Sequence, residues 1–295
     1  MAVFVWFCTE LAHIFFLIEP LSFLQSVSIL RNKNREIETV YRFVGLADCL
    51  LSVYYLREEL PYYCLPEKAD NGYRLEGEEI YHPLIEDCVS NSVIIKEKSV
   101  LLNGSNMSGK TTFIRIIGIN VLLAQTLHTA FARTFALSAP IKIYSALMLA
   151  DDLSEGKSFY MKEVDTIKEM ISRSQEGTAN LFLFDEIFKG TNTTERIAVA
   201  KAVLSYLNTT DNIIVTSTHD AELATLLDTE YDLYHFSEVI QDETFSFDYK
   251  LKSGPLYQRN AIRLLEINGF PPTVIRDAYR TIEKISYPPT STQPL

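Results

Sequence analysis

The segment Gly104-Ser-Asn-Met-Ser-Gly109-Lys110-Thr111 fits the pattern G-x-x-x-x-G-K-[ST], and it decides the fold of this chain. It follows Val100-Leu-Leu in the apolar run Ser99–Asn103, which is typical of a buried strand, and it precedes a helical pattern over Thr111–Ala124. Glycines at such a junction let backbone N–H groups curl around phosphates, and the helix N-terminus adds a positive end. The segment therefore predicts a phosphate-binding loop, or P-loop, rather than an ordinary glycine-rich turn.

The residues of this loop have expected roles toward ATP and Mg²⁺. Lys110 reaches the β- and γ-phosphates and is a candidate catalytic group, while the Thr111 hydroxyl ligates the metal. The expected ATP-binding residues are Gly104, Ser105, Asn106, Met107, Ser108, Gly109, Lys110, Thr111 and Thr112.

Two carboxylates end a second apolar run, Leu181-Phe-Leu-Phe-Asp185-Glu186. In open α/β sheets ligands bind at the carboxyl ends of the strands, so we expect Asp185 to complete the Mg²⁺ shell. Glu186 is a candidate catalytic residue that orients or deprotonates the attacking water. Without the loop, the same acidic pair would more often be a helix cap or a solvated turn.

A histidine follows a third apolar run, Asn212–Thr218. A strand here would deliver His219 to the same sheet edge, where its ring can hydrogen-bond the γ-phosphate. A single histidine after a strand is usually structural, and only its position beside the other two motifs favours a catalytic role.

Strand-like and helix-like segments alternate after about residue 70, which predicts an α/β fold with a mainly parallel sheet. The other expected strands are Asn180–Phe184, Tyr231–Phe236 and Thr244–Lys252, and the other expected helices are Phe159–Ser174, Thr194–Leu207, Asn260–Asn268 and Pro272–Ile285. The predicted organisation is a helical arm over residues 1–70, an ATPase domain over 71–258, a helix pair over 259–287 and a disordered tail over 288–295.

Composition restricts the partners and the compartment. There are 27 Lys and Arg against 38 Asp and Glu, giving a net charge of −11, so the chain repels polyanions and any contact with nucleic acid must be local. The four cysteines show no zinc or disulfide spacing, and Met1–Phe7 lacks the basic start of a signal peptide. We expect a cytoplasmic protein.

Four motifs in order resemble the ATPase domain of the MutS family of DNA mismatch-repair proteins, in a short and divergent branch. They are Asn106-Met107 within the loop, Asp151-Asp152 followed by Gly156, Ser158 and Glu163, the run from Asp185-Glu186 to Gly190-Thr191-Asn-Thr193, and Ser-Thr-His219. The resemblance extends from about Tyr81 to about residue 285.

The resemblance implies a P-loop NTPase of ABC-ATPase type that dimerises with itself or with a MutS-like partner. Ser158 would reach the γ-phosphate held by the other subunit, although it could also cap the helix that begins at Phe159. The arm resembles the end of the family's lever, and the C-terminal helices resemble its dimerisation segment; simple lid packing is the alternative. DNA binding is implied by family only. Longer members of the branch carry membrane helices upstream, which leaves membrane association open.

Departures from the family pattern keep other functions open. Cys88 stands where the repair enzymes have an aromatic residue that stacks on adenine, and Phe188-Lys189 replaces a Gly-Arg pair. The mismatch-reading domains do not appear, so we do not expect this chain to recognise mismatches itself. The alternatives are an ABC-type engine working with a membrane or protein partner, and a nucleotide-gated module that seldom hydrolyses ATP.

Overall fold

The computed structural model describes residues 1–15, 17–69, 74–105, 107–147, 159–177, 179–209, 211–241, 244–256 and 261–286. The chain divides into two compact units, Met1–Glu59 and Leu60–Leu295. Each unit is described by itself below.

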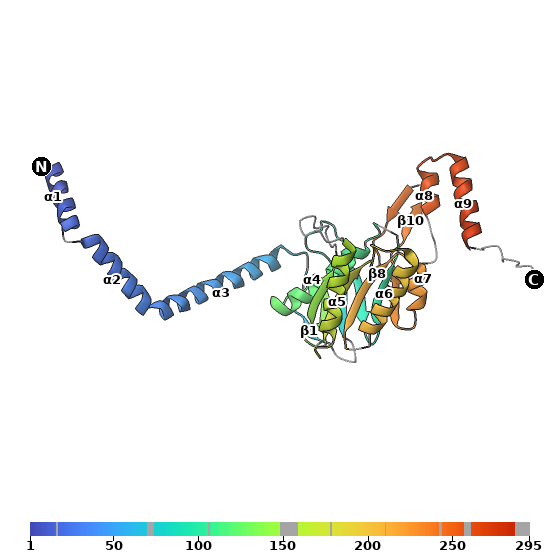
Figure 1. The fold of residues 1–295 in the computed structure, drawn as a ribbon, viewed down its shortest axis with the longest axis horizontal. Coiled ribbons are helices and arrows are strands. Elements are labelled where there is room, and N and C mark those ends of the chain that lie inside the picture. Colours follow the sequence, from blue (N-terminus) through green and yellow to red (C-terminus); the bar gives the residue numbers. More distant parts are fainter. Residues whose placement is uncertain are drawn as a thin grey trace, which may run out of the picture. The chain divides into compact units, whose positions relative to one another are not determined.

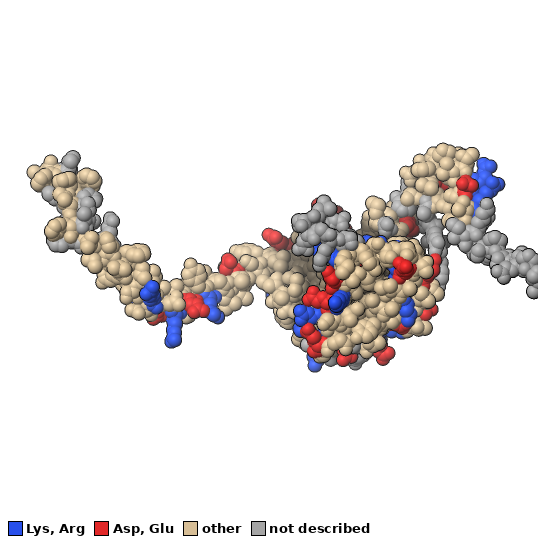
Figure 2. Space-filling model, viewed as in Figure 1, with Lys and Arg blue, Asp and Glu red and all other residues tan. Residues whose placement is uncertain are grey.

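The first unit is helical, as the sequence predicted. It consists of α1 (Ala2–Phe15), α2 (Ile18–Asn32) and α3 (Asn34–Glu59), drawn in blue in Figure 1. None of the α3 side chains is buried. The side chains of α1 that Figure 2 does not draw in grey are uncharged. The unit ends at Glu59 rather than near residue 70. Among the described helices, none is long and apolar enough to cross a membrane.

The second unit is built on a six-stranded sheet in the order β12-β9-β4-β8-β7-β6. All its neighbouring strands run parallel except β12, which pairs antiparallel with β9. The strands are β4 (Ser99–Asn103), β6 (Lys142–Ala146), β7 (Asn180–Asp185), β8 (Ile213–Thr218), β9 (Tyr231–His235) and β12 (Lys252–Ser253). The unit is therefore a mixed α/β fold with a parallel sheet, which confirms that part of the prediction.

Both faces of the central strands β4, β7 and β8 are buried, which explains why these strands show no alternation of apolar and polar residues. Val100 and Leu102 of β4 belong to one hydrophobic cluster, with α4 (Lys110–Thr126), whereas Leu101 belongs to the cluster on the other face. That second cluster contains residues from α5 (Phe159–Ser174), α6 (Thr193–Leu207) and α7 (Ala221–Leu226). The sheet therefore lies between α4 on one face and α5, α6 and α7 on the other, as Figure 1 shows.

A second sheet, in the order β1-β5-β2-β3, was not predicted. Its strands are β1 (Glu67–Lys68), β2 (Leu75–Ile80), β3 (Asn91–Ile95) and β5 (Thr134–Leu137). Side chains of β2, β3 and β5 join the same cluster as α4, whereas both residues of β1 are exposed.

The region after the central strands differs in detail from the prediction. The single strand expected over 244–252 is two short strands, β11 (Thr244–Phe247) and β12, with Tyr249 at φ 51° between them. A positive φ interrupts a strand, and this separates the two. β11 pairs with β10 (Glu238–Gln241) in a hairpin. The expected C-terminal helix pair is confirmed as α8 (Ala261–Ile267) and α9 (Pro272–Ser286).

The strand order brings the predicted motifs together. β4, β8 and β7 are neighbours, with Asn103 level with Thr218 and Asp185 level with Ser217. Because these strands are parallel, their carboxyl ends meet at one edge of the sheet. The loop after β4, the acidic pair of β7 and the histidine after β8 therefore share that edge.

Candidate active site

The loop between β4 and α4 adopts a backbone that requires glycine at both ends. Gly104 has φ 149° and Gly109 has φ 106°, a region that other residues rarely enter. A Cβ added at Gly104 would lie 2.6 Å from the carbonyl oxygen of Phe236. The glycines predicted from the motif are thus needed for the curved backbone of this loop.

Lys110 lies inside this loop and is 5% exposed. Its Nζ donates to the carbonyl oxygens of Gly104 and Ser105, at 2.7 and 2.6 Å. Burial lowers the pKa of Lys110, while the nearby carboxylates of Glu186 and Asp185 act in the opposite direction. The Ser105 hydroxyl is buried, and no partner for it exists among the described residues. A buried cation and an unpartnered hydroxyl in one loop fit a phosphate group.

The expected metal ligands lie in contact. The Thr111 hydroxyl donates to Asp185 Oδ2 at 2.8 Å, and the Ser217 hydroxyl donates to Oδ1 of the same carboxylate at 2.5 Å. Carboxylate and hydroxyl oxygens are the hard donors that Mg²⁺ prefers. The pair therefore fits a magnesium ion completed by phosphate oxygens and water.

Glu186 is placed beside this pair by an unusual backbone. It has φ 55°, its N–H donates to Ser217 O at 3.2 Å, and its side chain is 13% exposed. Its Oε2 lies 3.3 Å from Nδ1 of His219 and 3.2 Å from Nζ of Lys189. The acid and the histidine expected to act together are thus neighbours.

Asp220, the residue after His219, is bound by a side chain of α6. Arg196 of α6 donates two hydrogen bonds to the Asp220 carboxylate, at 2.8 and 3.0 Å. Such bidentate pairs fix geometry as well as charge. This pair holds the end of the β8 strand, and with it the backbone that carries His219.

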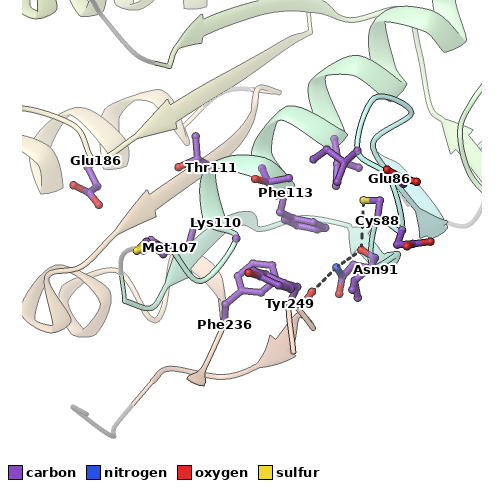
Figure 3. Close-up of a pocket in the computed structure, with 16 residues that line it drawn as sticks. Glu86, Cys88, Asn91, Met107, Lys110, Thr111, Phe113, Glu186, Phe236 and Tyr249 are labelled. Atoms are coloured by element: carbon purple, nitrogen blue, oxygen red, sulfur yellow. Dashed lines mark hydrogen bonds between the residues drawn. The ribbon is translucent and has the colours of Figure 1, made fainter. Parts of the chain in front are cut away.

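A pocket of about 500 Å³ opens next to the loop. Lys110, Thr111 and Glu186 line one part of it, and Figure 3 shows Cys88 and Asn91 away from Glu186, toward the other end. The rings of Phe113, Phe236 and Tyr249 line the space between them. A part lined by Lys110, Thr111 and Glu186, next to a part lined by three aromatic rings, suits the phosphates and the base of a nucleotide.

Tyr249 also lines the pocket, although none of the predicted motifs contains it. Asn91 holds it in place, because its Nδ2 donates to Tyr249 O at 2.9 Å and its Oδ1 accepts from the Leu251 N–H at 2.7 Å. No motif surrounds Tyr249, so local sequence gave no signal. Cys88 also lines the pocket.

The predicted residues divide into three groups. Met107, Gly109, Lys110, Thr111, Thr112 and Glu186 line the pocket. Gly104, Ser105, Ser108, Asp185 and His219 stand at the same sheet edge through the contacts given above, with the Ser108 hydroxyl bonded to Ser105 O at 2.8 Å. Asn106, Asp151, Asp152 and Ser158 lie outside the described residues.

The fold and the loop define this chain as a mixed α/β protein with a P-loop at the carboxyl edge of a parallel sheet. A model of the family MutS domain V matches residues 100–286. The chain belongs to this family.

Several curated relatives carry the name DNA mismatch repair protein MutS. The protein of that name from Listeria welshimeri is 26% identical over 281 residues, which cover 91% of this chain and 32% of the relative. The one from Synechococcus sp. is 29% identical over 240 residues, covering 76% and 27%. The one from Roseiflexus sp. (strain RS-1) is 27% identical over 275 residues, covering 87% and 24%. This chain thus spans less than a third of the length of these relatives.

Proposed function

We propose that this chain is a Mg²⁺-dependent ATPase of ABC-ATPase type and works as a dimeric nucleotide switch in DNA mismatch repair or related DNA metabolism. One observation carries the proposal. The Thr111 hydroxyl and Asp185 are hydrogen-bonded at the mouth of a loop that contains a buried lysine, and Glu186 lies next to them in contact with His219. This set of groups suits phosphoryl transfer to water, which asks for positioning and charge stabilisation.

Each side chain has a task in this reaction. When ATP binds, Lys110 gives up its hydrogen bonds to the loop carbonyl oxygens and donates instead to oxygens of the β- and γ-phosphates. Thr111 and Asp185 hold the magnesium ion, whose charge neutralises the phosphates. Glu186 orients the attacking water and accepts its proton, and His219 donates a hydrogen bond to the γ-phosphate. Asn106 and, from the other subunit, Ser158 contact the same phosphate in this proposal.

The role in DNA metabolism rests on the family and on the names of the relatives. The net charge of −11 opposes a general attraction to DNA, and on the face shown in Figure 2 basic and acidic side chains of the second unit are interspersed. DNA contacts in this proposal are therefore local or shared with a partner. Dimerisation through the ATPase unit, with this chain or a MutS-like protein, completes each site.

The deciding experiment is the steady-state ATPase rate of the purified chain, alone and with homoduplex, mismatched and branched DNA at low salt. We expect Mg²⁺-dependent hydrolysis that one class of DNA stimulates. A rate indifferent to all three would remove the DNA role and favour a protein partner. Absence of hydrolysis with ATP and Mg²⁺ under all conditions would overturn the ATPase proposal.

The aromatic rings that line the pocket lead to a prediction about the nucleobase. We expect Tyr249→Ala to raise the KM for ATP about 5- to 150-fold, because losing a ring that stacks on a base costs about 1–3 kcal/mol. The kcat should change little, since Glu186 and the metal ligands are untouched. Steady-state kinetics of Tyr249→Ala and Tyr249→Phe measure this, with exposed Tyr206→Ala on α6 as the control. An unchanged KM in Tyr249→Ala would place the base elsewhere.

A further inference from the structure

Helix α5 carries a buried acid that the reaction above does not use. Glu163 is only 5% exposed, although its helix also bears exposed acids such as Glu169. Burying a carboxylate is unfavourable unless hydrogen bonds compensate for the lost water. The contacts of Glu163 therefore show what this burial achieves.

Those contacts lie on the turn that follows the acidic pair. The Phe188 N–H donates to Glu163 Oε1, and the Lys189 N–H also acts on the same carboxylate. Burial raises the pKa of Glu163, and these two N–H groups oppose that rise. Glu163 thus reaches from α5 to the backbone two and three residues beyond Glu186.

This turn needs support from outside itself. Glu186 and Phe188 have φ values of 55° and 61°, a conformation that is strained for residues other than glycine. Strained backbone persists only where the surroundings hold it. The carboxylate of Glu163 accepts the N–H of Phe188, one of the two strained residues, so it favours the strained turn over relaxed alternatives.

The same helix holds the turn at a second point. A Cβ added at Gly190 would lie 2.8 Å from Cβ of Tyr160, so the first turn of α5 touches the backbone at Gly190. The ring of Tyr160 also packs on Phe188, with ring centroids 6.4 Å apart. Helix α5 therefore contacts residues 188–190 through the carboxylate of Glu163 and through the side chain of Tyr160.

We propose that Glu163 is the positioning residue that holds the turn after Asp185-Glu186 so that the Glu186 carboxylate stands at the attacking water. This inference rests on the proposed ATPase function. Glu163 itself touches neither nucleotide nor metal, and it acts only through the backbone of Phe188 and Lys189.

Two variants and one control test this role. Glu163→Leu removes the acceptor and places an apolar side chain at the buried position. Glu163→Gln keeps one oxygen that can accept the Phe188 N–H. We expect kcat to fall about 100-fold in Glu163→Leu, because a misplacement of about 1 Å has such a cost. The loss should be smaller in Glu163→Gln, with ATP affinity near wild type in both. Glu169→Gln, an exposed acid on the same helix, should match wild type.

A double substitution separates positioning from general stability. If Glu163 acts through Glu186, Glu163→Gln should cost nothing further in a Glu186→Gln background, as measured by single-turnover hydrolysis. Multiplying losses in the double variant, or an unchanged kcat in both single variants with wild-type melting temperatures, would overturn the proposal.

Amide hydrogen exchange gives a readout that does not depend on hydrolysis. The Phe188 and Lys189 amides should exchange about 10- to 100-fold faster in Glu163→Leu than in wild type, since a hydrogen bond to a charged group contributes about 1.5–3 kcal/mol. Unchanged exchange would show that Glu163 does not hold the turn. If the wild-type chain hydrolyses no ATP, the proposed function fails, while this exchange result still decides whether the turn is held.

Discussion

Glu186→Gln should retain ATP binding and lose most turnover, with kcat reduced about 100- to 10,000-fold, the range for a lost general base. The amide keeps the size of the side chain but accepts no proton from water. Binding should be equal to wild type or tighter, because the substitution removes a negative charge close to Lys110, the residue proposed to bind the phosphates. Fluorescence titration with an ATP analogue and single-turnover hydrolysis measure the two effects separately.

A matched control for this variant is Glu176→Gln. Glu176 is an exposed acid that pairs with Arg173 and Lys142, outside the pocket lining. Its replacement should leave both binding and hydrolysis unchanged. Hydrolysis at the wild-type rate in Glu186→Gln would remove Glu186 from the reaction.

Lys110→Ala should weaken ATP binding by at least about 30-fold. The ammonium group is buried in the loop and bonded to two carbonyl oxygens, and truncating one partner of a buried charge pair costs about 2–5 kcal/mol. The substitution also removes the buried cation that faces the carboxylates of Asp185 and Glu186, so their repulsion of a phosphate would be less compensated. Equilibrium titration with Mg-ATP measures the loss.

Lys142→Ala is the control for that experiment. Lys142 begins β6, at the amino end of the parallel sheet and therefore at the edge opposite the loop, and its side chain is 52% exposed. We expect unchanged ATP affinity in this variant. Equal affinity of Lys110→Ala and wild type for Mg-ATP would mean that the loop does not bind the phosphates.

The central sheet and the glycine-rich loop between β4 and α4 could be predicted from the sequence, because both depend on local sequence. Doubly buried strands such as Asn180–Asp185 are continuous apolar runs, and the glycines of the loop are fixed by the backbone they must adopt. The parallel order then places the ends of β4, β7 and β8 together without further information.

The second sheet and the place of Tyr249 in the pocket wall could not be predicted, because both depend on pairings between distant segments. β2 reads Leu-Glu-Gly-Glu-Glu-Ile and has no clear alternation, and it is stabilised by β5, which follows α4. Tyr249 enters the pocket only because Asn91 binds its carbonyl oxygen. Glu163 belongs to the family motif, but only the structure shows that it bonds to the Phe188 amide.

The hydrogen bonds from Asn91 to Tyr249 and Leu251 also bear on how this protein is made. They join residues 158 and 160 positions apart, so a chain emerging from the ribosome has its phosphate loop long before it has the opposite wall of the pocket. If the chain binds ATP as proposed, both parts of the pocket can contact the nucleotide only after Tyr249 has emerged and the second sheet has folded. The nucleotide would then stabilise this unit late, and the growing chain must reach that stage on its hydrophobic clusters alone.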